Sequence, residues 1–333
     1  MKNYLPSQES TDIGNKMTKI LVTGGCGYVG SVLIPELLES NHAVKVVDAQ
    51  WFGNNLPPHP NLEILKKTVE DISTEDLNGI EIVIHLANVA NDPSVELNPS
   101  FSWEVNVLHT NLLLEKCKKT KSIRKFVYAS SGSVYGVRPE ERVTEEVDLT
   151  PISIYNKTKM STERVVLSFQ GDFETYSIRP ATVCGVSPRM RFDVVVNMFV
   201  LQAYTTGKIN VFGGKQVRPN IHIRDMARVY KHFIGSEGIP SGAYNAGFEN
   251  LLVSDIAEQV ATLFDAEIHY SDSNDPRSYR QDSSKLLGTG FRPEFQVSDA
   301  IKEISEALQS GHIKDTPNSH TVGWMKQNKI GIN

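Results

Sequence analysis

Short apolar runs alternate with longer segments of helical spacing along the first half of the chain. Six runs are continuous and rich in β-branched residues, and they predict buried strands at 19–23, 43–48, 62–66, 81–87, 125–130 and 175–180. The intervening segments 28–40, 99–118 and 153–170 repeat apolar residues at helical spacing. Continuous apolar strands that alternate with helices predict a doubly wound α/β (Rossmann) fold, with a parallel sheet covered on both faces.

After residue 180 the rhythm is less regular. We expect a helix near 192–206, a strand at 208–212, a strand near 243–247 that returns to the first sheet, and helices near 253–264 and 297–309. These segments predict two lobes, with a Rossmann domain at 17–180 and a smaller, mainly substrate-binding α/β lobe at 181–333. The polar residues 1–16 precede the first apolar period, and we expect them to form a flexible N-terminal arm.

Composition narrows the classes of function. The 333 residues include 34 Lys+Arg and 39 Asp+Glu, a net charge of −5, with 40% apolar and 22% charged residues. These values are typical of a globular protein, and they indicate no basic surface for nucleic acid or an anionic membrane. An anionic ligand would therefore be bound by a few placed cations.

Targeting and cysteine patterns predict a cytoplasmic protein. The apolar segment 192–204 is interrupted by polar residues, and the N-terminus lacks the apolar core of a secretory signal. The three cysteines are far apart and lack C-x-x-C spacing, which argues against a disulfide framework or a metal site.

A glycine-rich turn follows the first predicted strand. The sequence TGGCGYVGS places Gly24, Gly27 and Gly30 between a strand and a helix, where glycine permits a tight turn and close approach to a pyrophosphate. The second strand ends in Asp48, whose carboxylate would accept hydrogen bonds from ribose hydroxyls and repel a 2′-phosphate. The pattern therefore favours NAD over NADP as cofactor.

Three further residues form a candidate catalytic set. Ser131 follows the fifth strand, and Tyr155 and Lys159 are four residues apart on a predicted helix, so they share one face. A nearby ammonium stabilises a phenolate, which lets tyrosine act as a general base. Ser131 would hold the substrate hydroxyl.

Together these motifs resemble the extended short-chain dehydrogenase/reductases, in particular the NAD-dependent nucleotide-sugar epimerase/dehydratase family typified by UDP-glucose 4-epimerase. Further matching elements are VEDIS, IHLAN, EVNV, SSGSVYG, SIRPATVCG and VRPNIHIRD. The resemblance implies that Ser131, Tyr155 and Lys159 are catalytic. It also implies cofactor contacts from Gly24, Gly27, Tyr28, Val29, Gly30, Asp48, Asp71, Ile72, Leu86, Ala87, Asn106, Tyr155 and Lys159. His85 in the IHLAN element is expected to be structural.

The residues after Ser131 separate the activities within the family. The 4,6-dehydratases carry an Asp-Glu pair there, whereas this chain has Gly132 and Ser133. Neither residue has a side chain whose pKa suits proton transfer. The favoured reaction is therefore redox at the sugar C4, by a nucleotide-sugar 4-epimerase that forms a 4-keto intermediate. Two alternatives stay open. One is a 4-dehydrogenase or 4-ketoreductase acting on a GDP- or dTDP-linked deoxyhexose or heptose for surface polysaccharide, and the other is a non-catalytic NAD-binding regulator.

The resemblance also implies the substrate contacts Ser131, Ser133, Thr182, Asn197, Arg218 and Arg277, with the arginines binding the diphosphate of a nucleotide sugar. Two departures stand out: Thr182 replaces an asparagine that touches the sugar, and Ala90 stands near the position of a cofactor-binding lysine. Arg189 and Arg191 could also reach the ligand, but a solvated loop is the favoured interpretation for them. Helices 99–118 and 153–170 are expected to form a homodimer interface.

Overall fold

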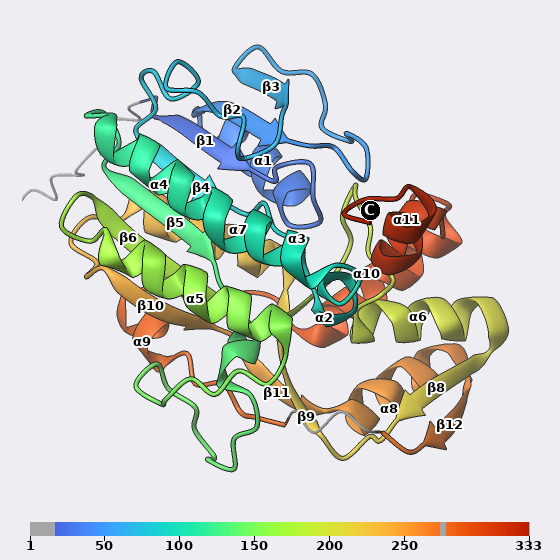
Figure 1. The fold of residues 1–333 in the computed structure, drawn as a ribbon. Helices are drawn as coiled ribbons and strands as arrows, with labels where there is room; N and C mark the ends of the chain where they lie inside the picture. Colours follow the sequence, from blue (N-terminus) through green and yellow to red (C-terminus); the bar gives the residue numbers. More distant parts are fainter. Residues whose placement is uncertain (1–16, 274–277, 333) are drawn as a thin grey trace, which may run out of the picture.

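A computed structural model of the protein describes residues 17–273 and 278–332. Its central sheet has seven parallel strands in the order β10-β6-β5-β4-β1-β2-β3 (Figure 1). These strands are β1 (Lys19–Thr23), β2 (Ala43–Asp48), β3 (Leu62–Lys66), β4 (Ile82–His85), β5 (Lys125–Ala129), β6 (Glu174–Pro180) and β10 (Gly242–Ala246). The predicted doubly wound α/β fold is confirmed.

Helices cover both faces of this sheet because side chains alternate along each strand. Ile20 and Val22 pack under α1 (Gly30–Glu39) and α7 (Ile223–Gly235), whereas Leu21 packs under α4 (His109–Lys119) and α5 (Ile154–Ser168). Figure 1 shows α4 and α5 side by side on one face. Shorter helices link these layers: α2 (Asp92–Val95), α3 (Pro99–Trp103), the 3-10 turn η2 (Gly132–Tyr135) and α9 (Ser284–Gly288).

The predicted helix 99–118 is interrupted rather than continuous. A π-helical turn, η1 (Glu104–Leu108), separates α3 from α4. The buried Asn106 in this turn accepts a hydrogen bond from Val89 N at 2.8 Å and donates to Thr158 Oγ1 at 3.2 Å. The wide turn thus ties the helix to the loop after β4 and to α5.

The second lobe has two small sheets. One contains β7 (Thr182–Cys184), β9 (Val217–His222) and β11 (Glu249–Leu252), and the other contains β8 (Lys208–Phe212) and β12 (Glu267–Ser271). Helices α6 (Val195–Thr206), α8 (Val253–Phe264) and α10 (Val297–Gln309) enclose a separate apolar core with these strands.

The C-terminal segment returns to the first lobe. It contains η3 (Pro317–Ser319) and α11 (Thr321–Gln327), and it contacts the loop that follows β2. Trp324 Nε1 donates a hydrogen bond to Trp51 O at 2.6 Å, and Asn318 Nδ2 donates to Phe52 O at 3.2 Å. The segment thereby closes over one end of the sheet.

The predicted strands 19–23, 43–48 and 62–66 match β1 to β3, and the strand near 243–247 joins the sheet beside β6 as expected. Four strands of the second lobe (β7, β9, β11 and β12) and the C-terminal elements are additions to the sequence-based picture. The expected arm at 1–16 lies outside the described residues. Across the described part of the chain, no helix combines the length and apolarity that a bilayer crossing needs.

Candidate active site

A cavity of about 840 Å³ opens at the carboxyl edge of the central sheet. Its wall includes residues at or directly after the ends of five strands, namely Gly24, Asp48, Leu86, Ser130 and Ala181. Across from them, the second lobe contributes Thr182 and Arg218. This is the edge at which doubly wound sheets bind ligands.

The glycine-rich turn brings backbone to the cavity at close range. Gly24 has φ +71°, and a Cβ there would lie 2.6 Å from Ala87 N, so a side chain would separate the loops after β1 and β4. A Cβ on Gly30 would lie 2.5 Å from Gly25 O. Helix α1 begins at Gly30 without a side-chain cap, so its positive end is open toward the turn. This geometry fits the diphosphate of a dinucleotide.

Asp48 stands beside this turn. Its carboxylate accepts hydrogen bonds from Cys26 N at 2.9 Å and Gln50 N at 2.6 Å. Burial raises the pKa of Asp48, and these two bonds oppose that rise. The carboxylate is fixed at the cavity wall, where it fits the ribose hydroxyls of NAD.

Tyr155 and Lys159 lie in the first two turns of α5, which begins where Ser153 Oγ accepts a hydrogen bond from Asn156 N. Lys159 Nζ donates to Ala129 O at 2.6 Å and lies 5.8 Å from the centroid of the Tyr155 ring. Burial lowers the pKa of Lys159 to about 7. The Lys159 side chain is therefore held close to the ring of Tyr155.

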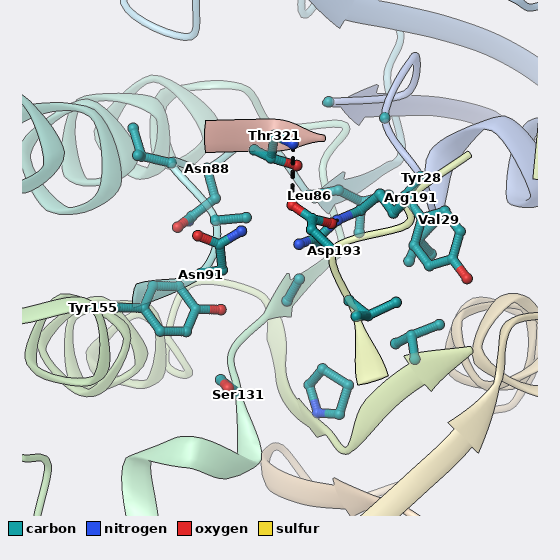
Figure 2. A pocket seen from close by; sticks show the side chains of 18 of the residues that line it. Tyr28, Val29, Leu86, Asn88, Asn91, Ser131, Tyr155, Arg191, Asp193 and Thr321 are labelled. Carbon is teal, nitrogen blue, oxygen red and sulfur yellow. Dashed lines mark hydrogen bonds and ion pairs between the residues drawn. The ribbon is translucent and has the colours of Figure 1, made fainter. Parts of the chain in front are cut away.

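Ser131 and Ser133 complete this side of the cavity. Their hydroxyls are 2.7 Å apart, and Ser133 Oγ donates to Asn156 Oδ1 at 2.6 Å. Figure 2 shows the Tyr155 hydroxyl pointing into the cavity, with Ser131 on the same side. The three predicted catalytic residues are thus brought to one wall.

Most of the predicted site residues line the cavity. They are Gly24, Gly27, Tyr28, Val29, Gly30, Asp48, Leu86, Ala87, Ser131, Ser133, Tyr155, Lys159, Thr182 and Arg218. Asp71, Ile72, Asn106 and Asn197 are absent from its wall. Arg277 lies outside the described residues.

The predicted residues away from the wall have other partners. The Asp71 carboxylate accepts a hydrogen bond from Thr68 Oγ1 at 2.6 Å on the surface, and the Ile72 side chain is fully buried in the core. The fully buried Asn197 accepts from Gly185 N and donates to Tyr28 Oη at 2.9 Å. Asn197 thereby joins the second lobe to the glycine-rich turn.

His85 has the structural role expected of it. Its ring nitrogens lie 2.6 Å from Thr23 Oγ1 and 2.8 Å from Thr110 Oγ1, and it is fully enclosed. Burial, and secondarily the charge of Lys159, lowers the pKa of His85 to about 3. The neutral ring links β1, β4 and α4.

Several cavity residues were missed by sequence reasoning. Asn88 is the last residue of the IHLAN element, and with its amide oxygen facing Lys159 it accepts a hydrogen bond from Nζ at 3.1 Å. The available signal for Asn88 was its position two residues after Leu86, which is expected to contact the cofactor. The expectation of a solvated loop at Arg189 and Arg191 is wrong, because both side chains line the cavity and Arg189 is 4% exposed.

Asp193 holds this segment in place. Its Oδ1 accepts from Arg191 Nε at 2.8 Å, and its Oδ2 accepts from Thr321 N at 3.1 Å (Figure 2). The C-terminal segment thus enters the cavity wall from the far end of the chain. In residues 17–273 and 278–332, no cluster of three or more His, Cys, Asp or Glu side chains is arranged to hold a metal ion.

Several known proteins are similar to this chain in sequence or in fold. A UDP-glucose 4-epimerase from Corynebacterium glutamicum is 30% identical over 319 residues, which cover 88% of this chain and 96% of that protein. A putative UDP-glucose 4-epimerase from Methanocaldococcus jannaschii is 27% identical over 321 residues, covering 93% and 99%. The crystal structure of Thermotoga maritima UDP-glucose 4-epimerase with UDP-glucose superposes with a TM-score of 0.81 at 25% identity, covering 89% and 100%.

The family model described as the NAD dependent epimerase/dehydratase family matches residues 20–247. This match spans the glycine-rich turn, Asp48, and the serine, tyrosine and lysine at the cavity wall. The predicted family, fold class and NAD cofactor are confirmed. The chain belongs to the NAD-dependent epimerase/dehydratase family.

Proposed function

We propose that this protein is a nucleotide-sugar 4-epimerase that oxidises and re-reduces C4 of its substrate. The observation that carries the proposal is the placement of Tyr155, Lys159 and Ser131 on one wall of a cavity that also contains the glycine-rich turn and Asp48. A regulator that only senses NAD would need the turn and Asp48 but no base. The relatives named UDP-glucose 4-epimerase support the same reaction class.

Each catalytic residue has a distinct task. Tyr155 removes the proton from the sugar O4, Lys159 stabilises the phenolate by its charge, and Ser131 positions O4. NAD, when bound, supplies the acceptor and then the donor of the C4 hydride. Tyr155 returns the proton when the 4-keto sugar is reduced on its opposite face, which inverts C4.

The residues beside Ser131 oppose dehydration. Gly132 and Ser133 supply neither acid nor base, and the Ser133 hydroxyl is engaged by Asn156 Oδ1 at 2.6 Å. Water elimination needs a proton donor and a proton acceptor near C5 and C6. The redox step at C4 is therefore the chemistry these residues support.

Residues 181–333 are proposed to bind mainly the nucleotide sugar. Arg218 on β9 lines the cavity, and its guanidinium fits the diphosphate of the substrate. Thr182 on β7 lines the same wall, and we assign it to the sugar. Asn197, which is bonded to Tyr28 and Gly185, is proposed to position this lobe and not to contact substrate.

Purified protein incubated with a panel of nucleotide sugars tests this function. C4 configuration is followed by NMR, and reduced nicotinamide by absorbance. We expect C4 inversion without net NADH, and a loss of at least about 10²-fold in kcat for Tyr155→Phe with NAD binding unchanged. Net NADH would identify a 4-dehydrogenase, and a Tyr155→Phe variant with full biological activity would identify a regulator.

We also propose that the protein is a cytoplasmic homodimer that supplies activated sugars for surface polysaccharide. Its three cysteines are free and buried, which is typical of a reducing compartment. Leu108 and Leu112, one turn apart, are 52% and 38% exposed, and Trp103 nearby is 38% exposed. An apolar stripe of this kind along η1 and α4 fits a partner helix from a second copy.

A further inference from the structure

Arg189 has an unusual environment for an arginine. Only 4% of its surface is exposed, and its Nε has no hydrogen-bond partner among the described residues. Burial lowers the pKa of Arg189 to about 9, and the charge of Arg191 acts in the same direction. The guanidinium is still charged at neutral pH, and the nearby carboxylates of Asp193 and Asp48 offset only part of the cost of burying it.

The segments around Arg189 hold it at the cavity. Its guanidinium carbon lies 3.9 Å from the centroid of the Phe52 ring, and Nη2 donates to Thr321 Oγ1 at 3.3 Å. The neighbouring Arg191 is paired with Asp193, whose other oxygen is bonded to Thr321 N. Arg189 is therefore oriented by a ring and a hydroxyl, and the carboxylates of Asp193 and Asp48 only partly offset its charge.

Hydrogen bonds of the residues before it, and its proximity to Tyr28 and Asp48, place Arg189 on the dinucleotide side of the cavity. Ser187 Oγ donates to Tyr28 O at 2.7 Å, and Tyr28 Oη donates to Gly185 O at 2.7 Å. Segment 185–191 is thus fixed to the glycine-rich turn. Figure 2 shows Arg191 between Tyr28 and Asp193, on the same side as the turn. Arg218, in contrast, reaches the cavity from β9 of the second lobe.

We propose that Arg189 is a phosphate-binding residue for the diphosphate of bound NAD, held in place by Phe52 and the C-terminal segment. A planar guanidinium stacked on an aromatic ring loses little freedom when it binds phosphate oxygens. The lysine expected after the IHLAN element is absent, with Ala90 near its place, and Arg189 supplies a cation from a distant segment. The proposal rests on the family cofactor and not on the sugar substrate.

Titration of nucleotide-free protein with NAD and, separately, with UDP tests this assignment. Arg189→Met is compared with Arg224→Met, because Arg224 also stacks on a phenylalanine, at 5.4 Å, but lies outside the cavity. We expect Arg189→Met to weaken NAD binding by at least about tenfold, to flatten its salt dependence, and to leave UDP binding unchanged. Arg224→Met should resemble wild type.

Two further measurements separate phosphate binding from a structural role. Arg189→Lys keeps the charge but loses the planar stack, so we expect NAD binding between wild type and Arg189→Met. Because Asp193 and Asp48 only partly offset the buried charge of Arg189, its removal should leave the melting temperature of the nucleotide-free protein unchanged or raise it. Unchanged NAD affinity in both variants, or weaker binding of UDP instead of NAD, would overturn the assignment.

Discussion

At the residue scale, the candidate chemistry depends on burial. Lys159 is 3% exposed, and its ammonium is bound by Ala129 O and faces the Asn88 amide, neither of which carries a full negative charge. Its charged form is therefore costly in the folded state, and its pKa is lowered to about 7. A proton that is easily lost suits a residue that modulates the charge of Tyr155 during turnover.

This lowered pKa predicts how stability depends on pH. The ordinary pKa of 10.5 applies to Lys159 in the unfolded chain, so between about pH 7 and 10.5 the unfolded state binds more protons than the folded state. The contribution of Lys159 to the free energy of unfolding therefore increases as pH rises through that window. We expect the free energy of unfolding of wild type, relative to Lys159→Met, to increase from pH 7 to 9.5 in urea titrations. A difference that does not change with pH would contradict the lowered pKa.

Individual site residues differ in how well the sequence predicts them. Gly24 directly follows β1 and Asp48 ends β2, so the predicted strand ends already place both residues at the edge of the sheet where the cavity lies. Arg189 lies in a polar stretch typical of a solvated loop, and its burial depends on Phe52 and Thr321, which are distant in sequence. Short local patterns hold no signal for such a three-segment contact.

At the element scale, α5 is locked to the sheet by a buried ion pair. Glu163 Oε1 lies 2.5 Å from Arg179 Nη2, with exposed side-chain fractions of 2% and 5%. Arg179 Nη1 donates to Tyr135 Oη at 2.6 Å, and Ser177 Oγ donates to Glu163 at 3.1 Å. One network thus joins the helix that bears Tyr155 to β6 and to the turn after Ser131.

Breaking this pair should destabilise the fold. Glu163→Gln leaves the buried guanidinium of Arg179 without its counter-ion, and we expect a loss of about 3 kcal/mol in the free energy of unfolding. Glu306→Gln is the control, because its pair with Lys302 is exposed, and its cost should be below about 0.5 kcal/mol. Equal effects of the two substitutions in chemical denaturation would show that the buried network does not hold α5.

Strands that consist of continuous apolar runs were predictable from the sequence. Elements that depend on long-range pairing were not. β1 to β3 match their predicted ranges because each is a short apolar run, and β1 and β2 are also rich in β-branched residues. β9 contains Pro219 and buried polar residues, so its apolar pattern is weak, yet it pairs with β7 and β11. The π-helical turn at Asn106 also depends on tertiary hydrogen bonds, which periodicity does not encode.

At the scale of the whole molecule, two separate cores meet at the cavity, and the C-terminal segment bridges them. One core lies under α1 and α7, and another lies among α6, α8 and α10. The segment with η3 and α11 bonds to the loop after β2 and to Asp193 of the second lobe. A ligand between the lobes would therefore be enclosed by parts of the chain that are far apart in sequence.

The proposed dimer is tested at this same scale. Replacing both Leu108 and Leu112 with Glu puts charge on the exposed apolar stripe, and we expect light scattering to report a monomer where wild type is a dimer. Leu263→Glu is the control, since Leu263 is 51% exposed on α8, away from the stripe. A monomeric wild-type protein, or a double variant that stays dimeric, would refute this interface.

Isotope transfer at C4 tests the central claim most directly. The nucleotide sugar identified in the substrate panel is prepared with deuterium at C4 and converted by the enzyme, and the product is analysed by NMR. Because the hydride that leaves C4 is returned to the same carbon, we expect the inverted product to retain deuterium at C4. Inverted product that carries solvent hydrogen at C4, or a substrate that inverts at another carbon, would contradict redox epimerisation at C4.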